Sequence, residues 1–192
     1  MIKSTSLPVE SRARGFTYLE LVFVIIILSL LYVFGIDKLL KLRVDAEAAG
    51  LAYAISGLQV ALSLQMAEMV ARGEMHKLSM LVGQNPMDWL LQTPEGYVGK
   101  RSPQQVGDVE PGQWYFDEAA GELVYRVRFV RYFQADQGDS PEVRLKVGLI
   151  FADKNRNGRF DRQKDDVQGV RLQTVTPYRW LDEPKKVFQS TS

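Results

Sequence analysis

The chain has 192 residues, of which 46% are hydrophobic and 24% are charged, so it can form a packed core and is not globally disordered. Lysine and arginine (24) nearly balance aspartate and glutamate (23), and this balance gives no indication of nucleic-acid binding. The absence of cysteine excludes disulfides, zinc–thiolate sites and cysteine nucleophiles, and a single histidine, His76, leaves little material for a histidine-based metal centre or catalytic triad.

The first 36 residues combine a basic segment with an apolar one. Residues 1–15 carry three basic side chains and one acidic side chain, whereas residues 16–36 carry a single charge, Glu20. A helix rises about 1.5 Å per residue, so these 21 residues span roughly 31 Å, close to the thickness of a hydrocarbon core. Basic residues ahead of an apolar segment predict a cytoplasmic N-terminus with the remainder translocated. Because no small-residue cleavage site follows, the simplest interpretation is an uncleaved signal anchor.

Glu20 does not suit a plain anchor. A carboxylate inside a membrane helix costs about 2.5 to 3.5 kcal/mol on insertion scales, and less near an interface. No lysine or arginine lies between Gly15 and Leu31 to pair with it. The nearest cation would be a free amino terminus, produced if the chain were cut just before Phe16. Glu20 therefore indicates a function that a passive anchor lacks.

Gly15, Phe16, Thr17 and Glu20, followed by a long apolar run, resemble the type IV pilin family, which includes the pseudopilins of type II secretion. The resemblance implies that a prepilin peptidase cuts between Gly15 and Phe16 and that the new N-terminus is methylated. It also implies that Glu20, then the fifth residue, pairs with the Phe16 ammonium of a neighbouring subunit during assembly. The resemblance is strong over residues 12–40 and looser beyond them.

The resemblance implies a structural subunit, either a minor pilin or a pseudopilin, and not an enzyme. Its location would be the bacterial inner membrane, as a single-pass protein with a periplasmic C-terminal domain, and later a pilus or pseudopilus. Its partners would be the prepilin peptidase and methyltransferase, other pilin or pseudopilin subunits, and the assembly platform in the inner membrane. The sequence does not distinguish adhesion, motility, DNA uptake and secretion. One departure from the family pattern is the lack of a helix-breaking proline near Asp37.

Two further functional interpretations compete with assembly. A membrane-anchored periplasmic module that binds calcium or another ligand is the alternative, and it would keep its anchor uncut and tolerate Glu20→Ala. An enzyme has no support, because the sequence contains no nucleophile-elbow, metal or phosphate-loop motif. The segments NPMDWL and PEGYVG resemble part of the minor pilins of mannose-sensitive haemagglutinin pili.

The apolar pattern continues beyond the membrane-length run with helical spacing. Steps of three and four residues place one apolar stripe on a single helix face. We therefore expect one helix from Phe16 to Arg72, with a transmembrane or filament-core half (16–40) and an amphipathic half (41–72), stopped by Gly73. The stripe comprises Val44, Ala48, Leu51, Ile55, Leu58, Leu62, Met66 and Met69.

Residues 73–112 are predicted to be a connector with short helical pieces. Asn85-Pro86 suits a turn or a helix start. Trp89, Leu90 and Leu91 are expected to dock on the core as apolar anchors of this connector.

Residues 113–192 are predicted to form an antiparallel sheet of about four strands. A hairpin is expected from GQWYF and ELVYRVRFVRYF, followed by the strands VRLKVGLIFAD and GVRLQTVTPYRWL, with Gly148 a candidate for a bulge. One sheet face should rest on the amphipathic half of the helix, which gives an α+β fold of the pilin ladle type. The expected apolar positions are Leu123, Tyr125, Val127, Phe129, Val143, Leu145, Val147, Ile150, Val170, Leu172 and Val175.

The segment DKNRNGRFD, residues 153–161, has two interpretations. An EF-hand-type calcium loop would use Asp153, Asn155, Asn157, the carbonyl of Arg159, and Asp161 as oxygen donors around Gly158. The bidentate glutamate of that motif is missing, so Asp165 or Asp166 would have to replace it. The second interpretation is an Asn-Gly hairpin turn between two strands. Both interpretations stay open, and calcium is the one cofactor that the sequence indicates.

Overall fold

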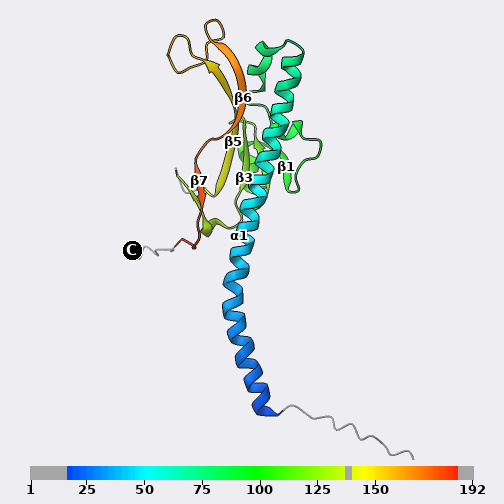
Figure 1. Ribbon diagram of the computed structural model, residues 1–192, viewed down its shortest axis with the longest axis vertical. Helices are drawn as coiled ribbons and strands as arrows, with labels where there is room; N and C mark the ends of the chain where they lie inside the picture. Colours follow the sequence, from blue (N-terminus) through cyan, green and yellow to red (C-terminus); the bar gives the residue numbers. More distant parts are fainter. Residues whose placement is uncertain (1–16, 137–139, 186–192) are drawn as a thin grey trace, which may run out of the picture. The chain divides into compact units, whose positions relative to one another are not determined.

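The computed structural model describes residues 17–136 and 140–185, and the chain divides into two compact units. The first unit ends at Leu42 and the second begins at Arg43, and each is considered by itself (Figure 1). One long helix, α1 (Tyr18–Ala71), contributes to both units, and the strands all belong to the second. The fold is α+β, as expected. Gly15 and Phe16 lie outside the described residues, so cleavage between them stays a sequence prediction.

The C-terminus of α1 ends in the way that its glycine predicts. Gly73 adopts a φ of 72°, which glycine reaches without a Cβ penalty. Its N–H donates to the carbonyl of Val70 at 2.9 Å, and the N–H of Glu74 donates to the carbonyl of Met69 at 2.8 Å. These two bonds form a Schellman motif that satisfies carbonyls at the helix end. The predicted stop at Gly73 is therefore confirmed.

The second unit contains two sheets rather than one. Its five-stranded sheet has the order β1-β2-β3-β5-β6, and β4 and β7 pair as a separate two-stranded sheet (Figure 1). All strand pairs are antiparallel except β1 with β2, which is parallel. The strands are β1 (Tyr97–Arg101), β2 (Trp114–Asp117), β3 (Glu122–Arg126), β4 (Phe133–Ala135), β5 (Glu142–Ala152), β6 (Asp166–Thr174) and β7 (Tyr178–Trp180). Four short 3-10 helices lie between them, η1 (Met75–Leu81), η2 (Pro86–Trp89), η3 (Pro103–Asp108) and η4 (Val130–Tyr132).

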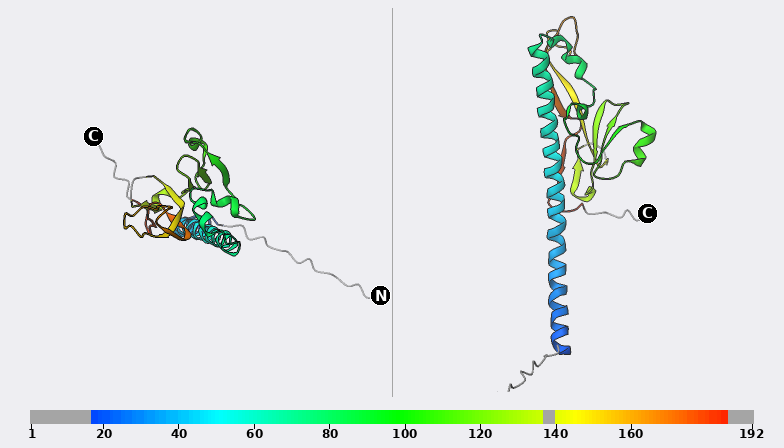
Figure 2. Two further views of the ribbon diagram at one scale, coloured as in Figure 1. Left: turned by 90° about the horizontal axis from the view of Figure 1, so that it is seen from above. Right: turned by 90° about the vertical axis from the view of Figure 1, so that its right-hand side faces the viewer.

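The main core lies between the second half of α1 and one face of the five-stranded sheet (Figure 2). Leu51, Leu58 and Leu62 of the predicted apolar stripe are at most 3% exposed. This confirms the predicted contact between the amphipathic part of the helix and the sheet. The strand residues in the same cluster are Trp114, Phe116, Leu123, Tyr125, Val143, Leu145, Val147, Val170 and Leu172.

The opposite face of the sheet is partly covered, which the sequence did not predict. Tyr115 and Val124 point to this face and are fully buried, and they form a second cluster with Val109. Val106 of η3 packs against the cluster, so the segment after β1 folds over the sheet. In β2 and β3, therefore, the face turned away from the helix is covered as well as the face that rests on it.

The predicted strand ELVYRVRFVRYF is interrupted after Arg126. The N–H groups of Arg128 and Phe129 donate to the carboxylate of Glu47 on α1, at 2.6 and 3.0 Å. These groups therefore cannot serve a strand partner, and η4 follows before the chain resumes as β4. The prediction of one continuous strand was wrong because an acceptor far away in the sequence competes with the sheet.

The connector holds a strand that was not predicted. β1 is short, and a register shift between Tyr97 and Lys100, with Gly99 at a φ of 88°, interrupts its pairing with β2. Such a strand shows no sustained alternation of apolar and polar residues, which is the signal that sequence reasoning uses. The expected antiparallel sheet of four strands is therefore corrected to five strands with one parallel pair.

Two smaller expectations in the strands were also wrong. The bulge expected at Gly148 lies instead between Ile150 and Phe151, opposite β6. Alternation therefore continues to Leu149, which packs against the core, whereas Ile150 is 38% exposed. The last predicted strand splits, since β6 ends before Val175, which is 44% exposed.

The short helix η2 begins where Asn85-Pro86 predicted a helix start. The Asn85 side chain accepts a hydrogen bond from the N–H of Met87 at 3.2 Å and donates to the Tyr97 hydroxyl at 2.8 Å. Trp89 and Leu90 pack against the core as expected. Leu91 was expected to dock with them, but its side chain is fully exposed, because the chain leaves the core surface after η2.

Candidate functional site

The start of α1 places Glu20 in the first helical turn. The N–H of Glu20 donates to the Thr17 hydroxyl at 3.2 Å, and the N–H of Leu21 donates to the Thr17 carbonyl at 3.1 Å. Thr17 is therefore the N-cap of the helix, and Glu20 stands three residues later. A carboxylate at this place interacts favourably with the positive end of the helix dipole.

Thr17 and Glu20 also fit a purely local motif. A threonine N-cap followed three residues later by glutamate is the capping-box pattern, in which the acid accepts from the N-cap N–H. One half of that motif, the bond to the Thr17 hydroxyl, is present. Glutamine serves the capping box as well as glutamate does. A capping role and an ion-pairing role can therefore be separated by Glu20→Gln.

The stretch after Glu20 presents apolar side chains outward. All described side chains from Tyr18 to Tyr32 are exposed, for example Leu28 at 59%. The one hydroxyl among residues 21–31, on Ser29, donates to the Ile25 carbonyl at 2.7 Å, which satisfies it within the helix. This outward surface therefore suits an apolar environment, either lipid or other helices.

Among the described residues, one helical stretch is long and apolar enough to cross a membrane, Lys38–Ala71, and Tyr18–Tyr32 is a shorter apolar stretch. Both belong to α1. Lys38–Ala71 includes Leu51 and Leu58, which the second unit buries in its core, so part of its apolar character is explained by packing. A membrane anchor in α1 is compatible with the structure, and its placement at residues 16–40 stays a prediction.

The 153–161 loop lies at the tip of the β5–β6 hairpin and is held by its own side chains. Asp153 accepts from the N–H groups of Asn157 and Gly158, at 3.2 and 2.7 Å. Asn155 and Asn157 accept from the N–H groups two residues later. Gly158 has a φ of 72° and Arg156 a φ of 57°, so the backbone is tightly wound here. The donors predicted for calcium thus serve backbone amides in the second unit.

The acids that were expected to complete the loop lie at its base. Asp165 is 6% exposed and accepts from the N–H groups of Lys154 and Asp161, at 3.0 and 2.7 Å. Asp166 begins β6, and its carboxylate pairs with the Lys154 ammonium at 2.7 Å. Asp165 therefore closes the base of the loop through hydrogen bonds to its backbone.

The structure gives a limited set of ligands for calcium in this loop. No group of three histidine or acidic side chains that could hold a metal occurs in residues 17–136 and 140–185. A calcium ion would have to use the Asn155 and Asn157 amides and the Arg159 carbonyl beside Asp153 and Asp161. Calcium binding stays a prediction, as does the plain turn.

Glu47 makes a long-range contact that sequence reasoning missed. Its carboxylate accepts from the Tyr125 hydroxyl at 2.8 Å and from the N–H groups of Arg128 and Phe129. Burial and, second, this hydrogen bond to Glu47 raise the pKa of Tyr125 well above its ordinary value. Glu47 is not part of the predicted apolar stripe, and periodicity carries no signal for such a long-range contact.

A charged cluster joins three strands on the outer face of the sheet. The Arg144 guanidinium contacts Asp117, Glu122 and Glu142, at 3.3, 3.1 and 2.9 Å. The Tyr115 hydroxyl donates to Glu142 at 3.3 Å. Burial and, second, the charge of Glu142 raise the pKa of Tyr115 to about 12. Each acid is bound to the arginine, so the cluster is a cross-strand brace between β2, β3 and β5.

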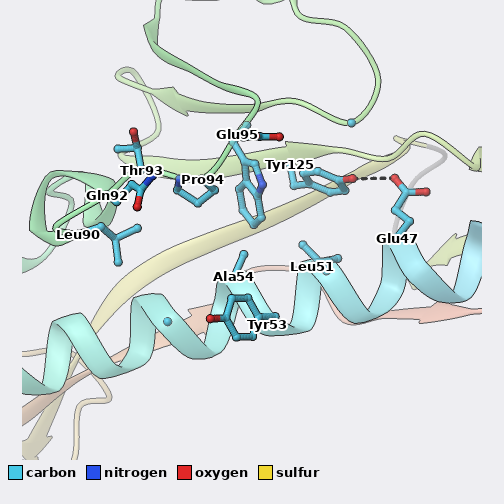
Figure 3. Close-up of a pocket in the computed structure, with 14 residues that line it drawn as sticks. Glu47, Leu51, Tyr53, Ala54, Leu90, Gln92, Thr93, Pro94, Glu95 and Tyr125 are labelled. Atoms are coloured by element: carbon cyan, nitrogen blue, oxygen red, sulfur yellow. Dashed lines mark hydrogen bonds between the residues drawn. The ribbon is translucent and has the colours of Figure 1, made fainter.

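A groove of about 580 Å³ opens beside α1 in the second unit. α1 lines one side with residues between Glu47 and Gly57, and Leu90 and residues 92–95 line the other (Figure 3). The hydrogen bond between Glu47 and Tyr125 lies at one end of the groove, and Leu90 lies towards the other end (Figure 3).

Comparisons of this chain with protein-family models, curated proteins and solved structures gave no match. The function must therefore be inferred from the chain's own residues and their geometry.

Proposed function

We propose that this protein is a pilin-like structural subunit, a minor pilin or pseudopilin, that is cut between Gly15 and Phe16 and assembled through α1. The observation that carries the proposal is the position of Glu20. It is the fifth residue counted from Phe16, and it stands ahead of a helical stretch that is apolar and outward-facing throughout its described residues. A cleaved chain would supply a cation, the Phe16 ammonium, for this carboxylate.

The chemistry of the helix start supports a pairing between subunits. After cleavage, the Phe16 ammonium would stand at the positive end of the helix dipole, where a positive charge is unfavourable. A carboxylate at Glu20 offsets that charge within one chain and, in lipid or in a filament, can pair with the ammonium of a neighbour. Such a pair is strong where water is excluded, since an unpaired charge there is costly.

The order of elements also supports the proposal. A long helix comes first, and its later part packs on a mainly antiparallel sheet, which is compatible with the pilin-like fold that the resemblance implies. The earlier part of the helix would lie in the inner membrane before assembly and among other helices afterwards. The sheet unit would be periplasmic, and the filament system is left open.

The first experiment determines the N-terminus of the protein in cells that make a prepilin peptidase. Mass spectrometry is expected to find a mature chain that begins at Phe16 and carries an N-methyl group. Gly15→Leu is the control, and it should retain the leader. An intact leader on the parent protein would contradict the proposal and favour an anchored binding module.

The second experiment separates ion pairing from helix capping at Glu20. Glu20→Gln keeps the capping box but removes the charge, so it should still be cut while the mature chain in sheared filaments falls by about tenfold or more, because 1.4 kcal/mol corresponds to tenfold. Glu20→Ala should lose assembly to at least the same extent. Normal assembly of the Gln variant would reduce Glu20 to a capping residue.

A further inference from the structure

A second cavity, of about 520 Å³, lies at the end of the second unit where α1 enters it. Arg43, the first residue of the unit, and Glu47 line the cavity from α1. Tyr125, Arg128 and Phe129 line it from β3 and the segment that follows. Arg43 and Arg128 are both exposed, and neither guanidinium forms an ion pair in the part of the chain that the structure describes. Both groups can therefore bind an anion that enters the cavity.

The acid that lines the cavity, Glu47, is bound by other groups of the unit. Its carboxylate accepts hydrogen bonds from the Tyr125 hydroxyl and from the N–H groups of Arg128 and Phe129. Asp45, which is also on α1, is exposed and does not line the cavity. Two guanidinium groups and one carboxylate give the cavity a net positive charge, which favours an anionic ligand.

The Arg128 side chain has a defined place in this cavity. A Cβ added to Gly112 would overlap the Nη2, Nε and Cζ atoms of Arg128, so the guanidinium lies against the bare backbone of that glycine. Gly112 has a φ of 87°, a conformation that glycine adopts without a Cβ penalty. A guanidinium that packing already positions loses less freedom when a ligand binds, and this preorganisation favours binding.

The position of the cavity along the chain indicates which anion can reach it. Arg43 follows Tyr32, the end of the outward-facing apolar stretch, by 11 residues, which a helix spans in about 16 Å. When that stretch lies in lipid, the phosphate groups of the membrane surface are the nearest dense array of anions. Val130, the neighbour of Phe129 in the chain, is 42% exposed and suits the apolar side of such a surface.

We propose that the cavity binds the phosphate group of an anionic phospholipid at the membrane surface, through the guanidinium groups of Arg43 and Arg128. A guanidinium binds phosphate through two parallel N–H bonds, and anionic lipids attract basic residues that follow a membrane segment. The contact holds the second unit on the membrane before a subunit is assembled. The inference rests on the proposed function, because it takes the Tyr18–Tyr32 stretch to lie in lipid at that stage.

A fluorescent label beside the cavity tests the contact in the full-length protein, reconstituted in lipid nanodiscs. The chain has no cysteine, so Val130→Cys gives a unique labelling site. The discs contain a lipid whose headgroup carries a nitroxide, which quenches a fluorophore at short range. Quenching should be strong in mixed phosphatidylglycerol and phosphatidylcholine and weaker in phosphatidylcholine alone, because the arginines require anionic headgroups. No quenching, or equal quenching in the two lipids, overturns the inference.

Paired substitutions assign the contact to the two arginines. Arg43→Gln with Arg128→Gln should remove most of the quenching, since each basic residue near an anionic surface strengthens the contact by about fivefold. Arg159→Gln with Arg171→Gln is the matched control, because it removes the same charge from exposed positions outside the cavity, and it should leave the quenching unchanged. Equal losses in the two double variants overturn the inference, because the net charge of the unit would then explain the attraction.

Two further measurements keep the test decisive. Thermal unfolding should be the same for the parent and both double variants. If the Arg128 change alters unfolding, Arg43→Gln alone replaces the pair and should weaken the contact by about fivefold. Calorimetric titration of the phosphatidylcholine discs with inorganic phosphate should give no heat. Heat from phosphate without quenching by anionic lipid would assign the cavity to a free phosphate and overturn the membrane contact.

The N-terminal mass of the protein made in cells separates this inference from the proposed function. A chain that is cut before Phe16 but shows no headgroup contact defeats the inference and leaves the proposed function standing. A headgroup contact in a chain that cells leave uncut supports the inference and defeats the proposed function. A chain that does not insert into the discs defeats both.

Discussion

The Tyr18–Tyr32 stretch and the unit that begins at Arg43 satisfy their side chains in opposite ways. In the stretch, apolar side chains face outward without a partner in the described chain. In the second unit, α1 buries Leu51 and Leu58 against the sheet. Among the described residues, no buried side-chain nitrogen or oxygen lacks a hydrogen-bond partner. The comparison teaches that the second unit satisfies its described buried polar side chains within the chain, whereas the stretch exposes apolar side chains that suit lipid or other helices.

The largest effect that separates the two regions is expected from leucine truncation. Leu58 is fully buried in the second unit, and Leu28 is 59% exposed in the stretch. Leu58→Ala should lower the free energy of unfolding by about 2 to 5 kcal/mol through lost burial and a cavity. Leu28→Ala should change it by less than about 0.5 kcal/mol. Denaturant unfolding of the detergent-solubilised chain, monitored by tryptophan fluorescence, measures both, and equal losses would remove the distinction.

A second prediction concerns the link between α1 and the sheet. Glu47→Ala leaves the Tyr125 hydroxyl and two backbone N–H groups without their acceptor, so unfolding should become easier by about 2 to 4 kcal/mol. Glu68→Ala is the matched control, because its carboxylate forms an exposed pair with Arg72, and it should cost less than about 1 kcal/mol. Similar losses for both variants would show that the Glu47 bonds add little.

A third prediction sharpens the idea that the second unit needs no ligand. Calorimetric titration with calcium should give no heat if the 153–161 loop is held by hydrogen bonds alone, and Asp153→Ala should then cost about 1 kcal/mol of stability, since it removes bonds to Asn157 and Gly158. A calcium loop instead predicts binding heat in the parent that disappears in Asp153→Ala. Either result decides between the two interpretations of this segment.

The smallest effect is expected at alkaline pH. The pKa of Tyr115 is raised to about 12, so the folded state holds this proton more tightly than the unfolded state, whose tyrosine titrates near 10. The associated stability is fully present below pH 10 and is lost as pH rises from about 10 to 12. Tyr115→Phe should make that decline shallower in pH-dependent unfolding. Tyr53→Phe, at an 83% exposed position, should leave the decline as in the parent.

Residues with local patterns were the ones that the sequence placed correctly. The apolar stripe predicted that Leu51, Leu58 and Leu62 would be buried, and Gly73 predicted the end of α1. Alternation predicted β3 and the apolar face of β5 through Val147. In each case neighbours within a few residues decide the conformation, because helix and strand periods are local properties.

The features of the candidate site also differ in whether the sequence alone reveals them. Glu20, its spacing from Phe16 and the uncharged run after it are visible in the sequence, since they depend on order alone. The contacts of Glu47 and the existence of the groove cannot be read from the sequence. Glu47 meets Arg128 and Phe129 from far away in the chain, and the groove needs the 90–95 segment to lie beside α1.

The sequence by itself determined the long helix, its end at Gly73, and the presence of strands after it. The tertiary structure alone decided that β1 runs parallel to β2, that β4 and β7 form a separate sheet, and that η3 covers Tyr115. The physical reason is that several partners compete for the same hydrogen-bonding groups and apolar surfaces. A backbone N–H bonds to the most favourable acceptor in space, and an apolar face packs against the most favourable apolar surface. A linear pattern does not show which partner that is.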